Sequence, residues 1–500
     1  MKSNKNSDSI SANAMAATSH PLATEEALNI LKKGGNAVDA AIAASICLSV
    51  VEPNSTGIGG DCFAIVKMEN KDPISYNGSG IAPKKANFEF FESKNIDKIE
   101  LTTPHSVTVP GALDAWKTIH DEHGKLDFEE LFLNSINYAE NGYKVTKKVS
   151  EAWEKSFKKL NNHKITKNLY LKNGKVYKNN ELRKNIPLAN TLKLIKKNGI
   201  KEFYQGSIAE DMVESLNEIG GLHSIEDFSI QKTLRSKTIS SNLKDMTVHQ
   251  CPPNGPGVTV LLMLKLLEKL KINKFNPDSV ERFHLEAEVT KLCYKIREEN
   301  IADPNYISID LEKILSEQNI QELFDNISLN KCYKINDLKI PNHPETVYLT
   351  VVDKDLNSVS IINSICYSFG SGITSNKSGI LFHNRGTNFR VERNHPNCIE
   401  GGKRPLHTII PGLALNNDNK TVLSFGVMGG QYQPVGQVHV FNNIFDFNMT
   451  PQEAISYPRA FHFNNIYKLE REISEDIKSK LETIGHKVCL LYTSPSPRDV

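Results

Sequence analysis

A polar connection changes into a strand pattern within Pro341-Asn342-His343-Pro344-Glu345-Thr346-Val347-Tyr348-Leu349-Thr350-Val351-Val352-Asp353. From Val347 onward the residues alternate between two faces, and their β-branched and aromatic side chains suit a pleated, buried surface. Asp353 begins a turn, and residues 358–364 return as the second strand of a hairpin. Thr346 therefore lies where a loop becomes the first residue of a hairpin.

Thr346 admits two interpretations. It is either a β-branched residue that opens a strand, or a threonine that becomes a chain N-terminus when the chain cuts itself after Glu345. In the second case its hydroxyl serves as a nucleophile. The stretch alone does not separate the two, so the rest of the chain has to.

Length and composition indicate a globular protein with one large layered domain or two domains. The 500 residues exceed what one simple core usually holds, and 39% hydrophobic with 24% charged residues is ordinary for this class. The formal net charge of +2 gives no global attraction to nucleic acid or to acidic membranes. The eight cysteines are scattered without a zinc spacing, which favours free thiols in a reducing compartment.

The first residues also bear on localisation. Residues 1–8 are polar with no apolar stretch behind them, so they do not have the pattern of a secretory signal. The longest apolar run, residues 40–51, is too short to span a bilayer. We therefore expect a cytoplasmic protein that binds neither nucleic acid nor membrane.

The pattern of elements predicts an α+β fold. Before the junction, apolar spacing predicts helices and a few strands, and after it strands dominate. The predicted helices are 21–31, 37–51, 112–120, 258–270, 437–445 and 469–486, the last with a strand to follow. The predicted strands, besides the hairpin, are 62–66, 74–77, 423–428 and a strand that runs into a loop over 379–389. The stretch 490–500 has no periodicity, and we expect the last dozen or so residues not to be native sequence.

Two patterns suggest chemistry of other kinds. The glycine-rich loop 53–61 follows a helix and precedes a strand, the reverse of the order in phosphate-binding loops, and it lacks their lysine. His284 and Glu288 share a helix face at i, i+4 and would suit a metal, but no third ligand is apparent. A hydrogen-bonding role that supports the helix is the simpler interpretation of this pair.

Several different short motifs follow one another along nearly the whole chain. They are Ala14-Met15-Ala16-Ala17-Thr18-Ser19-His20-Pro21, Gly34-Gly35-Asn36-Ala37-Val38-Asp39-Ala40-Ala41, Gly57-Ile58-Gly59-Gly60, Val109-Pro110-Gly111, Phe203-Tyr204, Pro252-Pro253, Gly370-Ser371-Gly372, Arg404-Pro405-Leu406 and Gly429-Gly430. With these motifs the chain resembles the γ-glutamyltransferase family of N-terminal-nucleophile hydrolases. The junction at Thr346 falls where that family cuts itself.

The resemblance implies a fold, a processing step and catalytic residues. The fold would be a four-layer αββα sandwich, built from a region 1–345 and a region 346–500 that become two subunits of one domain. Cleavage between Glu345 and Thr346 would free the nucleophile, and the backbone N–H groups of Gly429 and Gly430 would form the oxyanion hole. Ser364 matches a threonine that supports the nucleophile. Simpler alternatives are a strand-ending turn at the glycines and an ordinary strand serine.

The substrate-binding positions depart from the usual pattern of the family. Ser79 stands where γ-glutamyl enzymes carry an arginine for the substrate carboxylate, and Asn388 stands where they carry an aspartate for its amine. Arg385 adds a cation that suits a carboxylate, and His407 and Thr408 replace a pair of serines. A surface arginine and a packed loop histidine are the alternatives for Arg385 and His407. These departures resemble the amidohydrolase and acylase branch, which includes oxamate amidohydrolase-like proteins.

We therefore expect a self-cleaving amide hydrolase or acyltransferase that acts on a small acyl or oxamate-like amide. It would use no cofactor and no metal, and it would be a heterodimer of its own fragments, with further dimerisation left open. Three alternatives remain: a true γ-glutamyl transferase that hydrolyses glutathione, a binding protein that does not cleave, and a metallohydrolase built on His284 and Glu288.

Overall fold

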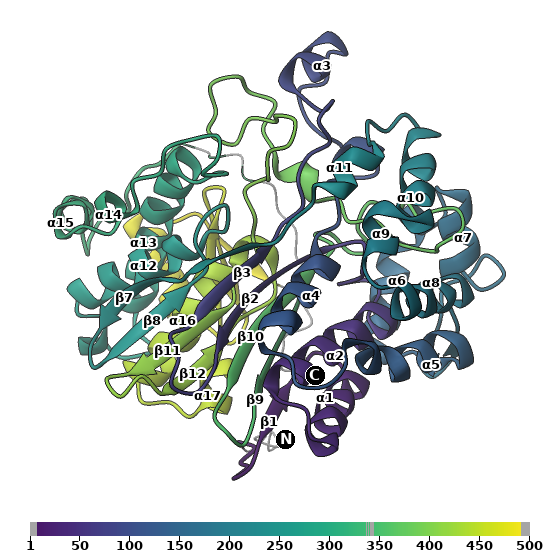
Figure 1. Cartoon of the computed structure of the whole chain (residues 1–500). Coiled ribbons are helices and arrows are strands. Elements are labelled where there is room, and N and C mark those ends of the chain that lie inside the picture. The colour runs from purple at the N-terminus through teal and green to yellow at the C-terminus, as the bar shows by residue number, and fades with distance from the viewer. Residues whose placement is uncertain (1–7, 337, 339, 341–344, 492–500) are drawn as a thin grey trace.

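Two β-sheets stacked between layers of helices form the centre of the molecule (Figure 1). The structure, a computed structural model, describes residues 8–336, 338, 340 and 345–491. The predicted junction residues 341–344 and most of the predicted non-native tail, 492–500, lie outside the described residues. The layers confirm the predicted α+β sandwich of αββα type.

The first sheet contains the hairpin predicted around the junction. Its order is β1-β9-β10-β2-β3-β6, with antiparallel neighbours throughout. The strands are β1 Met15–Ala17, β9 Val347–Val352, β10 Ser358–Ser364, β2 Asp61–Lys67, β3 Ile74–Gly78 and β6 Leu234–Lys237. Strands from the two ends of the chain therefore interleave, and Thr346 directly precedes β9.

The second sheet packs face to face on the first. Its order is β12 Thr421–Phe425, β11 Gly412–Asn416, β8 Met246–Gln250 and β7 Ile239–Leu243. On β2, Phe63 and Ile65 point into the core between the sheets, where they meet Ile362 and Leu413. The alternating residues of β2 join the other core, under the helices. Burial on both faces fixes the register of β2, because a slip by one residue would exchange its two sets of side chains.

Helices cover the outer face of each sheet (Figure 1). Against the first sheet lie α1 Pro21–Lys33, α2 Ala37–Val51 and α4 Ala112–His123, and α5 Leu133–Asn141 packs on α2. Every residue of α2 is buried, which agrees with its lack of a polar face. Against the second sheet lie α12 Gly257–Lys269 and α16 Gln433–Phe445, and α13 Val280–Asn300 packs on α12. The helix predicted over 437–445 begins earlier, because Pro434 fits its first turn.

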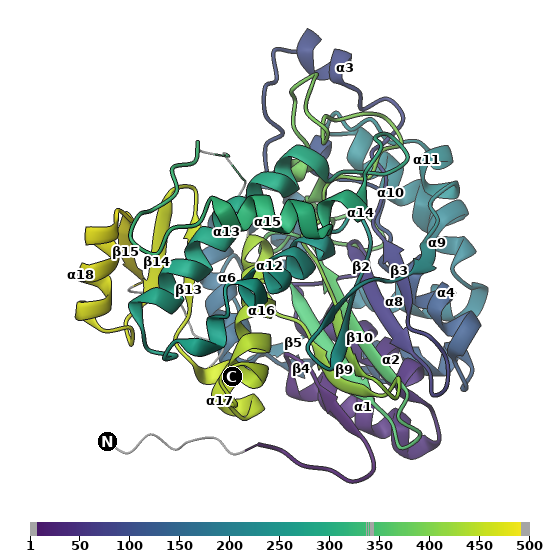
Figure 2. The ribbon, with the colours of Figure 1, turned by 90° about the vertical axis from the view of Figure 1, so that its left-hand side faces the viewer.

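Smaller elements surround this sandwich. They are α3 Phe88–Ser93, α6 Lys147–Leu160, α7 Lys164–Tyr170, α8 Ile186–Asn198, α9 Lys201–Gln205, α10 Ser207–Asn217, α11 Ile225–Ser229, α14 Leu311–Ile314, α15 Glu317–Asp325, α17 Pro451–Ser456 and the pair β4 Tyr143–Lys144 and β5 Leu182–Arg183. A third sheet, β13 Ala460–Phe463, β14 Ile466–Glu470 and β15 Val488–Leu491, carries α18 Glu475–Ile484 and packs on α13 (Figure 2). Leu490 and Leu491, which we expected in the non-native tail, pair with β14.

Two predicted elements are wrong in part. The range 379–389 contains only an isolated pairing of Leu381 with Thr374 and a 3-10 turn, Arg385–Asn388. A side chain at Gly59 would lie 2.2 Å from the Leu381 carbonyl oxygen, so the glycine loop takes the place beside this segment that a partner strand would need. In the range 469–486 the helix begins only at Glu475, because Leu469 belongs to β14.

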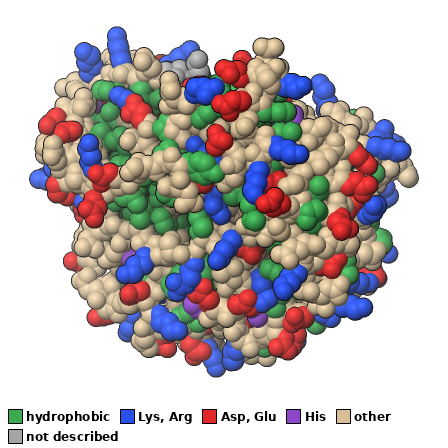
Figure 3. Space-filling view, turned by 45° about the horizontal axis from the view of Figure 1, so that its top comes forward, with side chains coloured by type: hydrophobic (Ala, Val, Ile, Leu, Met, Phe, Trp, Pro, Cys, Tyr) green, Lys and Arg blue, Asp and Glu red, His purple; other side chains and the backbone are tan. Residues whose placement is uncertain are grey.

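The exterior has mixed charge. On the face drawn in Figure 3, Lys and Arg side chains alternate with Asp and Glu side chains. Within the described part of the chain, no helix combines the length and the apolar character needed to cross a bilayer.

Candidate active site

Thr346 is buried at the start of β9, with its hydroxyl beside the peptide bond that precedes it. Its Oγ1 donates a hydrogen bond to the carbonyl oxygen of Glu345. Ser364 Oγ, at the end of β10, lies 3.4 Å from Thr346 Oγ1. Gln433 Nε2, in the first turn of α16, donates to the same oxygen over 3.4 Å. The hydroxyl thus faces its own upstream carbonyl and is held by groups from both sheet and helix.

Ser364 polarises the carbonyl that Thr346 faces. Its Oγ accepts hydrogen bonds from Arg385 Nη2 at 3.1 Å and from the backbone N–H of Cys366 at 2.9 Å. Because both of these groups donate into the oxygen, the serine proton points away from them, and the Glu345 carbonyl oxygen lies 3.2 Å away to accept it. Ser364 therefore connects the buried cation Arg385 to the Glu345–Thr346 peptide bond.

Gly429 and Gly430 form the turn that leads into α16. Their φ angles of 115° and 56° lie in the left-handed region, where a side chain would be strained. Among the described residues, no group accepts a hydrogen bond from the N–H of either glycine. Gln433, which contacts Thr346, lies just beyond this turn. Both N–H groups are therefore without an acceptor among the described residues, and the turn that carries them ends at Gln433.

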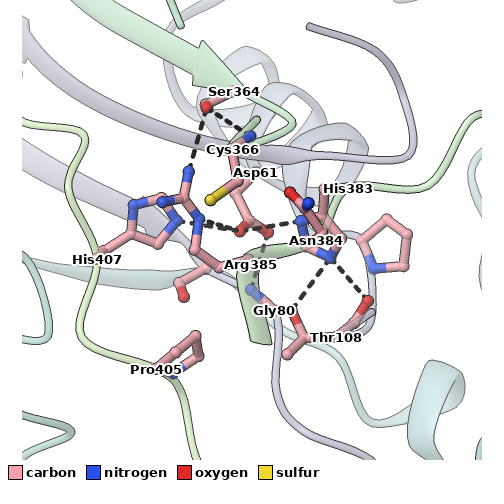
Figure 4. A network of polar contacts seen from close by, with 12 residues as sticks. Asp61, Gly80, Thr108, Ser364, Cys366, His383, Asn384, Arg385, Pro405 and His407 are labelled. Carbon is pink, nitrogen blue, oxygen red and sulfur yellow. Dashed lines mark hydrogen bonds and ion pairs between the residues drawn. The ribbon is translucent and has the colours of Figure 1, made fainter. Parts of the chain in front are cut away.

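Arg385 is fully buried, so the alternative of a surface arginine is wrong. Its Nη1 donates to Thr408 Oγ1 at 2.9 Å, and its Nε lies 3.7 Å from Asp61 Oδ2. Asp61 is the first residue of β2 and is also fully buried. Figure 4 shows the guanidinium group between this carboxylate and Ser364.

Asp61 lies between two histidines (Figure 4). His407 Nε2 is 3.0 Å and His383 Nδ1 is 3.3 Å from Asp61 Oδ2, and the N–H of Gly80 donates to Oδ1 at 3.0 Å. Burial acts to raise the pKa of Asp61, but the electrostatic interaction with His383 and the hydrogen bond that His407 donates outweigh it and hold that pKa below its usual range. The carboxylate is therefore ionised and serves as the counter-ion of Arg385.

His407 is a neutral member of this cluster. Burial and the neighbouring Arg385 charge lower its pKa to about 3. Its Nδ1 accepts hydrogen bonds from the backbone N–H groups of Thr408 and Ile409. The single proton of the neutral ring must then sit on Nε2, which donates it to Asp61. In the uncleaved chain His407 therefore supports the cluster from inside the protein.

The two remaining predicted substrate residues, Ser79 and Asn388, flank the segment 404–408. Ser79 is buried and its Oγ accepts a hydrogen bond from Asn254 Nδ2 at 3.1 Å. Asn388 Nδ2 donates to the Leu406 carbonyl at 3.0 Å, whereas its buried Oδ1 has no partner among the described residues. The Asn388 side chain therefore lies beside this segment with its N–H group paired and its carbonyl oxygen unpaired.

The sequence did not single out Asp61, His383 or Gln433 as site residues. Asp61 follows two glycines and opens a strand, and its partners His383 and His407 are more than 300 residues away in the chain. Gln433 lies in a stretch that we expected to precede a helix. The one usable signal was Asp61 itself, an acidic residue at the start of an apolar strand, which could have indicated a functional site.

His284 and Glu288 do not form an evident metal centre. Their ligand atoms and one of His486 lie within 4.8 Å of one another, but His284 bonds directly to His486 at 2.7 Å. The buried Lys291 ammonium donates to Glu288 at 2.6 Å and already supplies the positive charge of the cluster. Glu288 also accepts from the N–H of Tyr333, so the cluster ties α13 to the segment that leads toward the junction.

The chain is similar to known proteins over nearly its whole length. The family model described as gamma-glutamyltranspeptidase matches residues 23–497. The chain is 33% identical to the glutathione hydrolase-like YwrD proenzyme of Bacillus subtilis, over 97% of this chain and 92% of that protein. It is 29% identical to the oxamate amidohydrolase proenzyme of Klebsiella pneumoniae, over 97% of this chain and 93% of that protein. The crystal structure of a cephalosporin acylase from Bacillus halodurans matches with a TM-score of 0.89 at 32% identity, covering 99% of this chain and 93% of that one.

Proposed function

The chain belongs to the gamma-glutamyltranspeptidase family and is an amide hydrolase of the N-terminal-nucleophile type, and on this premise we propose that Thr346 is its nucleophile. The observation that carries the proposal is the hydrogen bond from Thr346 Oγ1 to the Glu345 carbonyl oxygen. This carbonyl belongs to the Glu345–Thr346 peptide bond, which self-cleavage would break. Ser364 contacts the same carbonyl and would stabilise charge on its oxygen.

Processing would proceed through an ester. Thr346 Oγ1 attacks the Glu345 carbonyl carbon, the carbon–nitrogen bond breaks, and the nitrogen takes up the hydroxyl proton to become an amine. Water then hydrolyses the ester and leaves a carboxylate on Glu345 and a free hydroxyl on Thr346. The fragments 1–345 and 346–500 would stay together as a heterodimer, because β1 and β2 of the first pair with β9 and β10 of the second.

The same oxygen would then act on substrates. The new α-amine of Thr346 has an ordinary pKa of about 7.7–8.0 and can accept the proton of its own hydroxyl near neutral pH. Attack on an amide carbonyl would give an acyl-enzyme, with the oxyanion held by the N–H groups of Gly429 and Gly430. The leaving amine takes the proton, and water, or an acceptor amine in a transfer reaction, releases the acyl group.

We propose that the substrate is a small acyl or oxamate-like amide. Ser79 and Asn388 are neutral at the places where the family resemblance leads one to expect an arginine and an aspartate. Arg385 would orient the catalytic groups through Ser364 and Thr408, and His407 would hold Asp61 against it. A relative named oxamate amidohydrolase and a structural neighbour named cephalosporin acylase support this choice.

A true γ-glutamyl activity is the second candidate. The relative with 33% identity carries the name glutathione hydrolase-like, and the free Oδ1 of Asn388 could accept an N–H of a γ-glutamyl amine. A neutral amide holds an ammonium group less tightly than a carboxylate does, which is why we place this activity second. A binding protein that never cleaves itself is the remaining alternative.

Denaturing electrophoresis of the purified chain tests the nucleophile. We expect two fragments, the smaller beginning Thr-Val-Tyr-Leu at Thr346, and a single uncut band for Thr346→Ala. A wild-type chain that stays in one piece would contradict the proposal. Parallel assays with oxamate, simple acyl anilides and a γ-glutamyl anilide then separate the two substrate classes, and strong γ-glutamyl turnover would favour the second candidate.

A further inference from the structure

The Gln433 side chain reaches the Thr346 hydroxyl from the first residue of α16. It is fully buried, and its Nε2 lies 3.4 Å from Thr346 Oγ1. Its Oε1 accepts a hydrogen bond from the backbone N–H of Ile410 at 3.2 Å. Because a backbone N–H group can only donate, the amide oxygen must face Ile410 and the amide nitrogen must face the nucleophile. Gln433 is therefore a hydrogen-bond donor toward Thr346.

A second glutamine holds Ile410 from its carbonyl side. Gln437 lies one helical turn further along α16, and its Nε2 donates to the Ile410 carbonyl oxygen. Its Oε1 accepts from Gln250 Nε2 at 2.7 Å. Gln250 ends β8 opposite Gly412 of β11, where a side chain would lie 2.9 Å from the Gln250 amide nitrogen. The direction of every hydrogen bond from β8 onward is thus fixed, and each one donates toward Thr346.

The donor from Gln433 restricts where the Thr346 hydroxyl proton can point. A hydroxyl oxygen has one proton and two lone pairs, and the amide N–H takes one lone pair. The proton is donated to the Glu345 carbonyl oxygen. Since Ser364 donates to that same carbonyl oxygen, the second lone pair of Thr346 remains for attack on the carbonyl carbon. As the hydroxyl proton leaves, negative charge develops on Oγ1 and strengthens the hydrogen bond from Gln433.

We propose that Gln433 is a catalytic residue that donates a hydrogen bond to the attacking oxygen of Thr346 in both self-cleavage and amide hydrolysis. The inference rests on the proposed function and adds to it the group that stabilises the nucleophile itself. The hydroxyl proton moves to the leaving nitrogen during processing and to the α-amine during turnover, while Gln433 keeps its own proton. Its anchor on Ile410 lies outside the bond that is cut, so the same donor serves both reactions.

The substitution Gln433→Glu exchanges the donor for an acceptor at nearly constant shape. One carboxylate oxygen can still accept from the Ile410 N–H, but the other presents an acceptor to Thr346. Burial raises the pKa of a carboxyl group, so its protonated form, which has an O–H donor, is populated as pH falls. We therefore expect self-cleavage of this variant to be at least about tenfold slower than that of the wild type at pH 8, and to recover most of the loss at pH 5.

The rate is measured as growth of the smaller fragment on a denaturing gel, after the precursor from cell-free synthesis is shifted to each pH. Division by the wild-type rate at the same pH removes the effect of the charged groups that both proteins share, such as Glu345 and Arg385. Asn442→Asp makes the same exchange of amide for carboxyl at a buried position further along α16. Its rate relative to the wild type should be the same at pH 5 and pH 8.

Turnover by the processed protein gives a second readout. Gln433→Met keeps the length of the side chain without its hydrogen bonds. With an anilide that the wild type hydrolyses, this variant should lower kcat at least about tenfold and change KM little, because Gln433 contacts the nucleophile.

The outcomes separate this inference from the proposed function. A wild type that cuts itself, together with a Gln433→Glu variant whose relative rate is the same at pH 5 and pH 8, overturns the inference alone. This comparison within one variant holds even where Gln433→Met disturbs the fold. A wild type that remains uncut overturns the proposed function as well.

Discussion

Arg385 Nη2 donates a hydrogen bond of 3.1 Å to Ser364 Oγ, and this contact orients the serine toward the Glu345–Thr346 bond. The serine oxygen accepts two hydrogen bonds, so its own proton can only be donated to the Glu345 carbonyl oxygen or to the Thr346 hydroxyl. A buried cation is thereby linked to the Glu345–Thr346 peptide bond through one intermediate side chain.

The first prediction concerns this serine. Ser364→Ala should slow self-cleavage by about 100-fold, the usual effect of losing one hydrogen-bond donor to a developing oxyanion. The rate is measured as the growth of the smaller fragment on a denaturing gel after synthesis of the precursor. Ser364→Thr keeps the hydroxyl and should cleave at close to the wild-type rate. Equal rates for the alanine variant and the wild type would exclude any role of Ser364 in processing.

A second prediction concerns the counter-ion of Arg385. Asp61→Asn keeps the shape of the side chain but leaves a buried guanidinium group without a negative partner. Removing one partner of a buried ion pair costs about 3–5 kcal/mol, so the free energy of unfolding in urea should fall by about that amount. The double variant Asp61→Asn with Arg385→Met removes both charges and should recover part of the loss. Additive effects of the two substitutions would contradict the coupling.

Asp61 and Arg385 show which features of the site could not be predicted from the sequence. The hairpin after Thr346 and the helix α2 were predictable, because their apolar patterns are local and strong. The Asp61 cluster was not, because it joins residues 61, 383, 385 and 407 only through the tertiary fold. Arg385 was chosen for its charge, yet the pattern around it could not reveal that its partners are Asp61, Ser364 and Thr408 inside the protein.

The glycine loop explains one of the failures. The range 379–389 has the composition of a strand, but Gly59 and Gly370 let neighbouring backbone approach Leu381 and Phe382 more closely than any side chain would permit. These close contacts with the glycines take the place of the hydrogen bonds to a neighbouring strand. A periodic pattern of apolar residues does not predict such contacts.

A third prediction uses the pH dependence of stability. Burial raises the pKa of Glu52 from its ordinary 4.5 to about 7, with Glu345 adding to the rise and Lys148 and Ser19 opposing it. The folded state therefore binds the proton more tightly than the unfolded state does, and stability falls as pH rises from about 4.5 to about 7. Above that window Glu52→Gln should be more stable than the wild type, by about 3 kcal/mol at most.

Urea unfolding at pH 4.5 and pH 8 measures this difference. The two proteins should differ little in stability at the lower pH, where Glu52 is protonated in the folded state and about half protonated in the unfolded state, and they should diverge at the higher pH. Glu25→Gln on the exposed side of α1 is the matched control and should follow the wild type at both values. A Glu52→Gln variant that is less stable than the wild type at pH 8 would show that the carboxylate is stabilised there.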